Sequence, residues 1–297
     1  MVLICPRIHF FEIHEQEWFP DYLREKVQSC LTLLWTIKLP AIQEASAAQS
    51  VARILSRVVG DKTRQYTYVD FCAGAGGPTP TIEKELNSKL TSSTNKSSQN
   101  SQSTEKTESN SPVQFVLTDL HPHIPDWTEI AKRNENITFF SEPVDATDVP
   151  ASLIGNNHKK IFRLYNLSFH HFDDKLGSDI LHNTLETADG FGIFELQERT
   201  ISSLFTIMNV GLLLFFITPF YFWRSPGHLF FTYIIPIIPL VVVVDGYTSS
   251  LRTRSSAEVL ALINKQTTPV ENWTFHSGTV RHAWPSGYLS WVIGIKK

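Results

Sequence analysis

The sequence predicts an α/β fold built around a Rossmann-like, mostly parallel sheet of seven strands. Short segments rich in β-branched and aromatic residues alternate with segments whose apolar residues recur at helical spacing. Such alternation is typical of βαβ units and therefore of a parallel sheet. A glycine-rich turn directly follows the first strand, where sheets of this class bind ligands. The strands are expected at residues 66–71, 113–119, 137–145, 160–169, 190–198, 272–280 and 288–296.

The other elements divide the chain into four parts. Helices at 21–35 and 44–59 precede the first strand, and the last two strands can pair as an antiparallel hairpin. Core helices are expected at 81–86, 127–134 and 178–188. The four parts are an N-terminal helical cap at residues 1–62, the Rossmann-like core at 63–199, an apolar segment at 200–244 and the C-terminal part of the core at 245–297.

Residues 91–111 interrupt the alternation with a polar insert. Seventeen of these 21 residues are Ser, Thr, Asn or Gln, and none is apolar. A segment of this composition cannot bury enough apolar surface to offset the conformational entropy that ordering would cost. It is therefore predicted to be a disordered surface loop inside the core, because the alternation resumes directly after it.

Two long uncharged stretches make up the apolar segment. Residues 200–223 and 225–244 contain no Asp, Glu, Lys or Arg, and each could cross a hydrocarbon core of about 30 Å. They predict a transmembrane hairpin that turns at 224–228, with Arg199 and Arg252 outside it on the cytosolic side. Four prolines count against two continuous helices. The alternative is an apolar cap that lies on the membrane surface or over the ligand site.

The composition limits the classes of partner. A net charge of −3 gives no basic face for nucleic acid. The three cysteines, Cys5, Cys30 and Cys72, form no disulfide framework, which is typical of a reducing compartment. No C-x-x-C pattern or His/Cys cluster predicts a metal site, and no feature identifies a protein partner.

The stretch VDFCAGAGGPTP, residues 69–80, carries the strongest chemical signal. Asp70 lies near the end of a strand, and Gly74, Gly76 and Gly77 follow in a turn that leads into a helix. Glycines let a ligand approach the backbone, and a helix N-terminus offers free N–H groups. The run does not match the G-x-G-x-x-G pattern of dinucleotide sites, and Asp70 would repel phosphate. An acid here favours a cationic or hydroxyl-bearing ligand.

This stretch resembles the first motif of the class I S-adenosylmethionine-dependent methyltransferases, an acid followed by spaced glycines. Cys72 stands where that motif has its first glycine. The resemblance implies S-adenosylmethionine as cofactor, with Asp119 after the second strand at the ribose hydroxyls and Asp145 after the third at the adenine amino group. The cofactor contacts that it implies are Asp70, Cys72, Gly74, Gly76, Gly77, Asp119, Asp145, Ala146 and Asn166.

Further segments resemble one microbial subfamily of methyltransferase-like proteins whose substrate is unassigned. They are EWFPDYLRE, LTDLHP, PVDATDVP, SFHHF, FELQERT, TYIIPIIPL, DGYTSSLRTRS and YLSWVIG, and with the glycine turn they span nearly the whole chain apart from the polar insert. This resemblance implies the seven-stranded methyltransferase fold and its cofactor, and leaves the reaction open.

The resemblance also points to the end of the fourth strand as the place of methyl transfer. Nitrogen methyltransferases often carry an Asn/Asp-Pro-Pro-aromatic motif there, whereas this chain has His170 and His171. A histidine of near-neutral pKa could take a proton from a hydroxyl as the methyl arrives, so both are candidate catalytic residues. The alternative is that one packs in the sheet and the other orders the turn at Asp173 and Asp174.

Two arginines follow the apolar segment. Arg252 either binds a carboxylate of substrate or cofactor or pairs with Asp245, while Arg254 is expected to be structural. Ser255 or Ser256 is expected to cap the helix that follows.

Together these features favour a membrane-associated enzyme whose catalytic domain faces the cytosol. The expected reaction is methyl transfer from S-adenosylmethionine to a small, apolar metabolite or lipid, on oxygen. One alternative is a non-catalytic membrane protein that retains the fold. Another is an RNA methyltransferase, because DFCAGAGG resembles the turn of the ribose-methylating enzymes. The acidic net charge and the presence of Asn166 and Ser168, where those enzymes carry an Asp, count against it.

Overall fold

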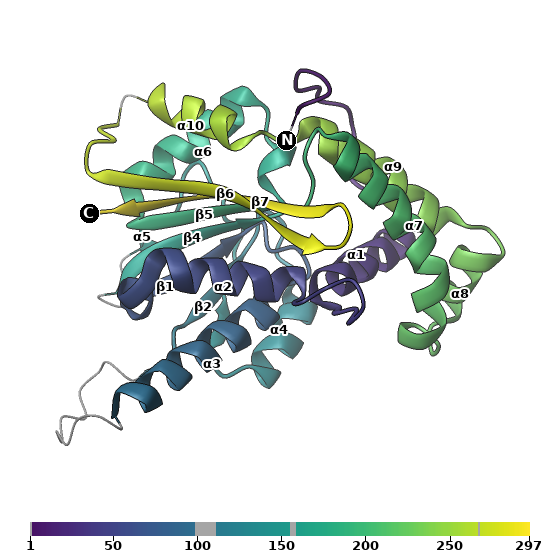
Figure 1. Cartoon of the computed structure of the whole chain (residues 1–297), viewed down its shortest axis with the longest axis horizontal. Coiled ribbons are helices and arrows are strands. Elements are labelled where there is room, and N and C mark those ends of the chain that lie inside the picture. Colours follow the sequence, from purple (N-terminus) through teal and green to yellow (C-terminus); the bar gives the residue numbers. More distant parts are fainter. Residues whose placement is uncertain (1, 99–110, 155–158, 267) are drawn as a thin grey trace.

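The computed structural model describes residues 2–98, 111–154, 159–266 and 268–297. It confirms the α/β prediction, with one seven-stranded sheet between two layers of helices (Figure 1). The strands are β1 (Tyr66–Phe71), β2 (Phe115–Thr118), β3 (Ile137–Phe139), β4 (Lys160–Asn166), β5 (Gly190–Glu195), β6 (Trp273–Ala283) and β7 (Gly287–Lys296). Their order is β3-β2-β1-β4-β5-β7-β6. β1 to β5 pair in parallel, and β7 runs antiparallel to both β5 and β6.

Helices cover both faces of the sheet. The helices of the core are α2 (Ala47–Val59), α3 (Thr79–Ser98), α4 (Ile124–Arg133), α5 (Ala151–Ile154), α6 (Asp174–Thr187) and α10 (Ser256–Asn264). Alternate residues of β1 face opposite ways, as the period of a strand requires. Tyr66 and Tyr68 join the apolar cluster under α2, α3 and α4, whereas Val69 and Phe71 join the cluster under α6 and α10.

Local signals set the ends of α2. The Ser46 hydroxyl accepts a hydrogen bond from the Gln49 N–H, and the Gln49 side chain accepts one from the Ser46 N–H. This reciprocal capping box starts the helix at Ala47, three positions later than predicted from periodicity. Gly60, at φ 60°, ends it in a conformation that favours glycine.

The polar insert is partly helical, contrary to the prediction of a disordered loop. Residues 91–98 continue α3, while residues 99–110 lie outside the described part of the chain. The hydroxyls of Thr91 and Ser92 donate to the carbonyls of Asn87 and Ser88, one turn back. Such bonds satisfy polar side chains on the helix itself, so a polar composition does not exclude helix here.

Strand β3 is shorter than its predicted range of 137–145. It ends at Phe139, and Pro143 cannot donate a ladder hydrogen bond in the following segment. The Val144 N–H donates to the Asp119 carbonyl at 2.9 Å, which still brings residues 144–146 beside the end of β2.

The apolar segment forms one long helix and one broken helix. They are α7 (Ile201–Tyr221), α8 (Pro226–Tyr233) and α9 (Ile237–Arg252). Of the described helices, α7 is the one long and apolar enough to cross a membrane by itself, and α8 and α9 qualify only as a pair bent by 73°. Pro236 lies at the bend, where proline disfavours a continuous helix. The predicted boundary at residue 244 falls inside α9.

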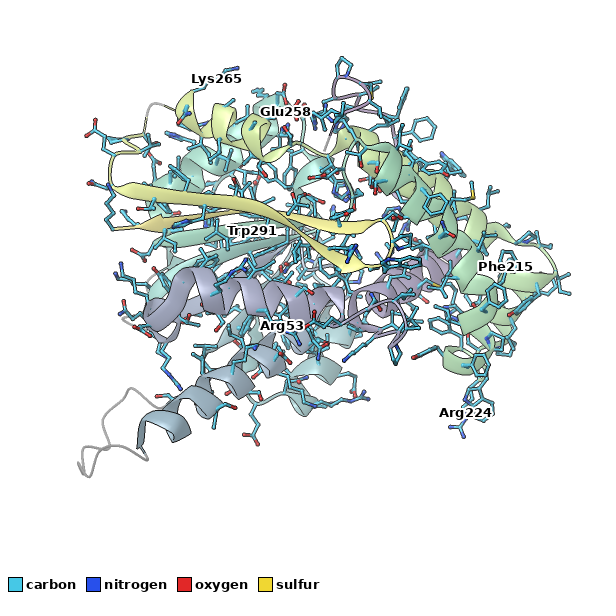
Figure 2. All side chains as sticks on the ribbon, viewed as in Figure 1. Arg53, Phe215, Arg224, Glu258, Lys265 and Trp291 are labelled. Carbon is cyan, nitrogen blue, oxygen red and sulfur yellow. The ribbon has the colours of Figure 1, made fainter. Side chains whose placement is uncertain are left out.

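The helix α1 (Asp21–Thr36) lies against this segment and against α2 (Figure 1). Leu23 and Val27 share an apolar cluster with Leu214 of α7 and with Ile238 and Val242 of α9. We call α7, α8 and the first half of α9, residues 237–244, the apolar cap. Figure 2 shows its side chains, with Phe215 and Arg224 at the end remote from the sheet.

An extended N-terminal strap, residues 4–15, completes the fold. The Ile4 N–H donates to the Arg199 carbonyl at 2.9 Å, and the Ile8 N–H donates to the Leu251 carbonyl at 3.0 Å. The strap thus runs past the end of β5 and along α9, beside the carboxyl edge of the parallel strands. The predicted N-terminal part is helical only from Asp21 onward.

Candidate active site

The turn after β1 uses left-handed backbone conformations at four positions. Cys72, Gly74, Gly76 and Gly77 have φ values of 59°, 51°, 94° and 40°. A Cβ at Gly76 would lie 2.2 Å from Cδ1 of Ile130, so a side chain there would displace Ile130 and would also be strained by the positive φ. A Cβ at Gly74 would meet no atom within 4 Å, so it would project into open space. At Gly74 a ligand could therefore approach the backbone without meeting a side chain.

Asp70 is buried beneath this turn. It accepts hydrogen bonds from the Thr79 hydroxyl and, at 3.0 Å, from the Asn166 side-chain amide. Burial raises the pKa of Asp70 to about 7, although both donors act in the opposite direction. The side-chain oxygen of Asn166 is also buried and has no hydrogen-bond partner among the described residues. Asp70 and Asn166 thus present acceptors that a cationic donor would satisfy.

Asp119 braces the turn from the end of β2. Its carboxylate accepts from the Gly74 N–H at 2.9 Å and from the His121 N–H at 2.9 Å. Trp127 donates to the Gly74 carbonyl at 2.7 Å. Burial raises the pKa of the Cys72 thiol, and the charges of Asp119, Asp70 and Asp145 add to that rise, so all three acids surround this turn.

The predicted cofactor residues divide into two groups. Asp70, Cys72, Gly74, Gly77 and Asn166 line one pocket of about 110 Å³, which we call the cradle. The other four predicted residues do not line it. Gly76 packs on Ile130, Asp119 holds Gly74, Asp145 accepts from the Thr147 N–H at 2.8 Å, and the Ala146 carbonyl lies 3.5 Å from an Arg163 nitrogen.

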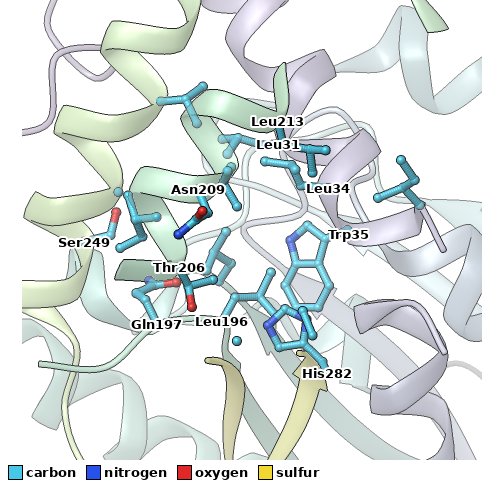
Figure 3. Close-up of a pocket in the computed structure, with 18 of the residues that line it drawn as sticks. Leu31, Leu34, Trp35, Leu196, Gln197, Thr206, Asn209, Leu213, Ser249 and His282 are labelled. Carbon is cyan, nitrogen blue, oxygen red and sulfur yellow. The ribbon is translucent and has the colours of Figure 1, made fainter. Parts of the chain in front are cut away.

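A larger cavity of about 730 Å³ adjoins the cradle. Cys72, Gly74 and Leu167 line both, as do Leu31 and Trp35 of α1. Figure 3 shows part of its wall, in which Leu31, Leu34, Leu196 and Leu213 lie together with polar side chains such as Gln197 and Asn209. The cavity is also lined by α1, α7, the second half of α9 and the β6–β7 hairpin, and none of the predicted cofactor or catalytic residues lies on these elements.

His170, at the polar end of this cavity, is held between two carboxylates. Its Nδ1 lies 2.9 Å from Glu195, and its Nε2 lies 3.5 Å from Glu12. Burial alone would lower the pKa of His170, but Glu195 and Glu12 outweigh it and raise that pKa to about 10. His170 is therefore an imidazolium near neutral pH, a charged and fixed group.

His171 is placed differently. Its side chain is 28% exposed, lines the cavity, and has Nδ1 at 2.5 Å from Glu15. Glu15 in turn is 3.0 Å from Arg252, whose guanidinium also lies 3.3 Å from Nδ1 of His171. Donation from Nδ1 to Glu15 would leave Nε2 as the acceptor nitrogen.

Sequence reasoning missed the acids of the N-terminal strap. The sequence signal was the segment FEIHEQE, in which three ionisable residues, Glu12, His14 and Glu15, lie within four positions. Their partners lie more than 150 residues away in the chain, so spacing could not reveal the cluster.

The structure also answers the question about the arginines. Arg252 does not pair with Asp245, because Glu12 and Glu15 bind Arg252, while Asp245 accepts from His14 and from the Ile13 N–H. Arg254 pairs with Asp174 at 2.7 Å. The expected helix cap is confirmed as the capping box of Ser255 and Glu258. Arg252 and Arg254 thus both have structural partners.

Glu12, His170 and His171 each offer a ligand atom within 4.8 Å of the others, as a metal site requires. However, the Arg252 guanidinium lies 3.2 Å from Glu12 and 3.3 Å from His171. A cation already occupies the position that would neutralise this group, so its geometry is that of an ion-pair network.

The chain resembles known proteins in its fold and not in its sequence. No protein-family model and no curated protein matches the sequence. Among solved structures, the plantazolicin methyltransferase BpumL, in complex with a triazolic desmethylPZN analog and SAH, is 14% identical, with a TM-score of 0.52 over 95% of this chain and 94% of that one. The fold is that of the class I methyltransferases. The resemblance expected from the sequence is thus confirmed for the fold.

Two further methyltransferase structures are similar at lower scores. An O-methyltransferase family protein from Burkholderia thailandensis is 9% identical, with a TM-score of 0.44, and the match covers 84% of this chain and 56% of that one. Magnesium protoporphyrin IX methyltransferase (ChlM) from Synechocystis, with bound SAM, is 8% identical, with a TM-score of 0.42 over 96% and 88% of the two chains.

The raised pKa of Asp70 in this methyltransferase fold makes a prediction about stability. The folded chain keeps a proton up to about pH 7 that an ordinary carboxyl releases near 3.8, so the folded state loses stability as the pH rises between these values. Asp70→Asn removes that loss. Its stability relative to the wild type should increase by up to about 4 kcal/mol from pH 4 to pH 7 and then level off, since one pKa unit is about 1.4 kcal/mol.

Urea unfolding of both proteins at several pH values measures this difference. Asp126→Asn, on the exposed face of α4, is the matched control and should show no such trend. A difference between Asp70→Asn and wild type that stays constant with pH would contradict a raised pKa at Asp70.

Proposed function

We propose that the chain transfers a methyl group from S-adenosylmethionine to a hydroxyl oxygen of a small, apolar metabolite or lipid. The observation that carries the proposal is the cradle, with its buried acceptors and bare Gly74, opening into a large apolar cavity. The fold supports the proposal, because sheets of this type bind ligands at the carboxyl ends of their strands.

The residues of the cradle match the cofactor in charge. When bound, S-adenosylmethionine supplies a methyl group on a positively charged sulfur. Asp70 and the unpartnered oxygen of Asn166 would hold its ammonium, and Gly74 would admit it to the backbone. Asp119 retains lone pairs for ribose hydroxyls beyond the two N–H groups that it accepts. Asp145 and Ala146 would border the adenine.

The proposed base is His171, oriented by Glu15. With Nδ1 donating to Glu15, Nε2 can accept the proton of a substrate hydroxyl in the cavity. His170 cannot serve as a base while Glu195 and Glu12 hold its proton. In our proposal His170 instead positions the polar end of the cavity as a fixed positive charge.

The apolar cap supports association with a membrane. One face of α7 carries large exposed apolar side chains, of which Phe216 is 71% and Phe220 79% exposed. Leu212 and Phe216 also line the cavity, so the exposed face and the cavity are continuous. An apolar substrate could therefore enter the cavity from a lipid layer.

The packing of α1 favours a cap on the membrane surface over a transmembrane hairpin. Leu23 and Val27 of α1 cluster with Leu214 near the middle of α7, while Glu25 of α1 is exposed. Crossing the bilayer would bring this acid to the depth of the hydrocarbon, which costs several kcal/mol. We propose that the cap lies in the interface, with the catalytic part on the cytosolic side.

The cofactor assignment predicts the effect of Gly74→Val. A side chain at this position would fill the open space of the cradle and weaken binding of S-adenosylhomocysteine at least a hundredfold, as measured by calorimetric titration. Gly60→Val is the matched control, because Gly60 also has a positive φ, of 60°, and no atom within 4 Å, but lies at the end of α2. Equal affinities in all three proteins would remove the cofactor assignment.

The base assignment predicts the effect of His171→Asn on methylation in cells. Cells that lack the chain are complemented with each protein, and their metabolites are searched for a difference of one methyl group. His171→Asn should form the product roughly a hundredfold more slowly, the usual contribution of a general base. His276→Asn, exposed on β6, should form it at the wild-type rate. Full complementation by His171→Asn would exclude the base role.

The surface assignment predicts binding to lipid vesicles. Phe216→Glu with Phe220→Glu should weaken flotation with phosphatidylcholine–phosphatidylserine vesicles at least tenfold, since each buried Phe contributes about 1.5–3 kcal/mol. Leu176→Glu, an exposed apolar residue on α6, is the control and should float like the wild type. Alkaline carbonate should release the native protein from membranes. Retention in the pellet would instead support the transmembrane hairpin.

A further inference from the structure

His282 is a polar side chain in the cavity wall that the proposed reaction does not use. Its ring lines the cavity on the same side as Trp35 in the view of Figure 3. Neither Nδ1 nor Nε2 is exposed, and neither has a hydrogen-bond partner among the described residues. Burial lowers the pKa of His282 to about 4, so the ring is a neutral imidazole with one donor and one acceptor.

A β-bulge fixes the position of His282. Arg281 pairs with Tyr288 and Ala283 pairs with Gly287, so His282 is the extra residue on β6. Bulges re-aim side chains and occur beside active sites. The hairpin beyond the bulge is tied down, because the Trp284 N–H donates to the Ile42 carbonyl at 2.7 Å.

The second anchor of the hairpin comes from the apolar cap. The hydroxyls of Thr206, on α7, and Ser286 are 2.8 Å apart, and the Ser202 hydroxyl donates to the Ser286 carbonyl at 3.0 Å. The hairpin that carries His282 is therefore anchored on both sides, and this holds the imidazole against the cavity. The two ring nitrogens make no hydrogen bond there to any described residue. An unpartnered buried polar atom is unfavourable, so a group that pairs with it gains more than it would in water.

The position of His282 in the sheet indicates how long a substrate must be to reach it. β6 lies three strands away from β4, which leads to His171, and this corresponds to roughly 14 Å at the usual strand spacing. The side chains at both ends shorten that span. A molecule that reaches both His171 and His282 must still be elongated, and the lining between them is mainly apolar.

We propose that His282 binds a hydroxyl or carbonyl group at the far end of an elongated, otherwise apolar substrate, distinct from the hydroxyl that is methylated. This rests on the proposed function for the identity of the cavity as a substrate site. A neutral imidazole can donate to a carbonyl or accept from a hydroxyl, and the surrounding apolar wall makes that bond selective. Sites that hydrogen-bond a substrate group in a dry pocket strongly reject analogues that lack it.

The test uses three rigid probes that share one carbon skeleton, namely biphenyl-4,4′-diol, 4-phenylphenol and biphenyl. Their dissociation constants are measured by calorimetry on the full chain loaded with S-adenosylhomocysteine. The wild type should bind the diol roughly five- to a hundredfold more tightly than 4-phenylphenol, because only the diol can place a hydroxyl at each end of the cavity. His282→Phe should remove that difference while leaving the affinity for biphenyl within about twofold.

Two variants separate recognition from a structural role. His282→Gln keeps a donor and an acceptor and should restore part of the preference for the diol, whereas His276→Phe on the exposed side of β6 should leave it unchanged. A purely structural His282 would change the affinities for all three probes together. In the wild type, ¹⁵N spectra of the imidazole should shift with the diol and not with biphenyl, which tests the contact without any variant.

The outcomes separate this inference from the proposed function. A wild type that binds the diol no more tightly than 4-phenylphenol overturns the role of His282, and so does the absence of measurable binding. S-adenosylhomocysteine affinity is measured on the same samples and should be equal in wild type and His282→Phe. Failure of the wild type to bind it would remove the cofactor assignment, and the same three probes measured on the unloaded chain would then still report on His282.

Discussion

The burial of one guanidinium organises the active-site half of this molecule. Arg252, at the end of α9, is 4% exposed and can hold its charge there only if acids and carbonyls surround it. Glu12, Glu15 and the Phe10 carbonyl, all in the N-terminal strap, supply these groups. The strap must therefore lie across the ends of the strands, and this closes one side of the cavity. Without the strap the charge of Arg252 would be buried unpaired, which is strongly unfavourable.

The same network sets the state of both histidines. Glu12 faces His170 as well as Arg252, and Glu15 faces His171 as well as Arg252. One strap thus fixes His170 as a charged group and orients His171. The adjacent rings, with centroids 4.1 Å apart, have different partners, because two carboxylates reach His170 and one reaches His171. Sequence alone presents them as two equivalent residues.

The features that could be predicted from the sequence are those set by residues close together in the chain. The strands, the turn at Asp70–Gly77 and the capping box at Ser255 follow from residues within about ten positions of one another, where propensity and spacing act. The cluster around Arg252 and the cavity depend on contacts between distant segments. The prediction that residues 91–98 are disordered was wrong for another reason. Hydroxyl side chains such as Thr91 and Ser92 can donate to carbonyls of the helix that carries them, so a polar segment can still be helical.

The helix α1 connects the two halves of the site. Its Leu31 and Trp35 line both the cradle and the cavity, while Leu23 and Val27, nearer the start of the same helix, pack on the apolar cap. Any displacement of the cap at an interface would reach the boundary between cradle and cavity through this one rigid element. The cradle itself is held by the sheet, with Asp70 bonded to Asn166 on the neighbouring strand and Asp119 bonded to Gly74. The cradle is therefore fixed by the core, whereas the cavity is shaped by helices such as α7, whose opposite face is exposed.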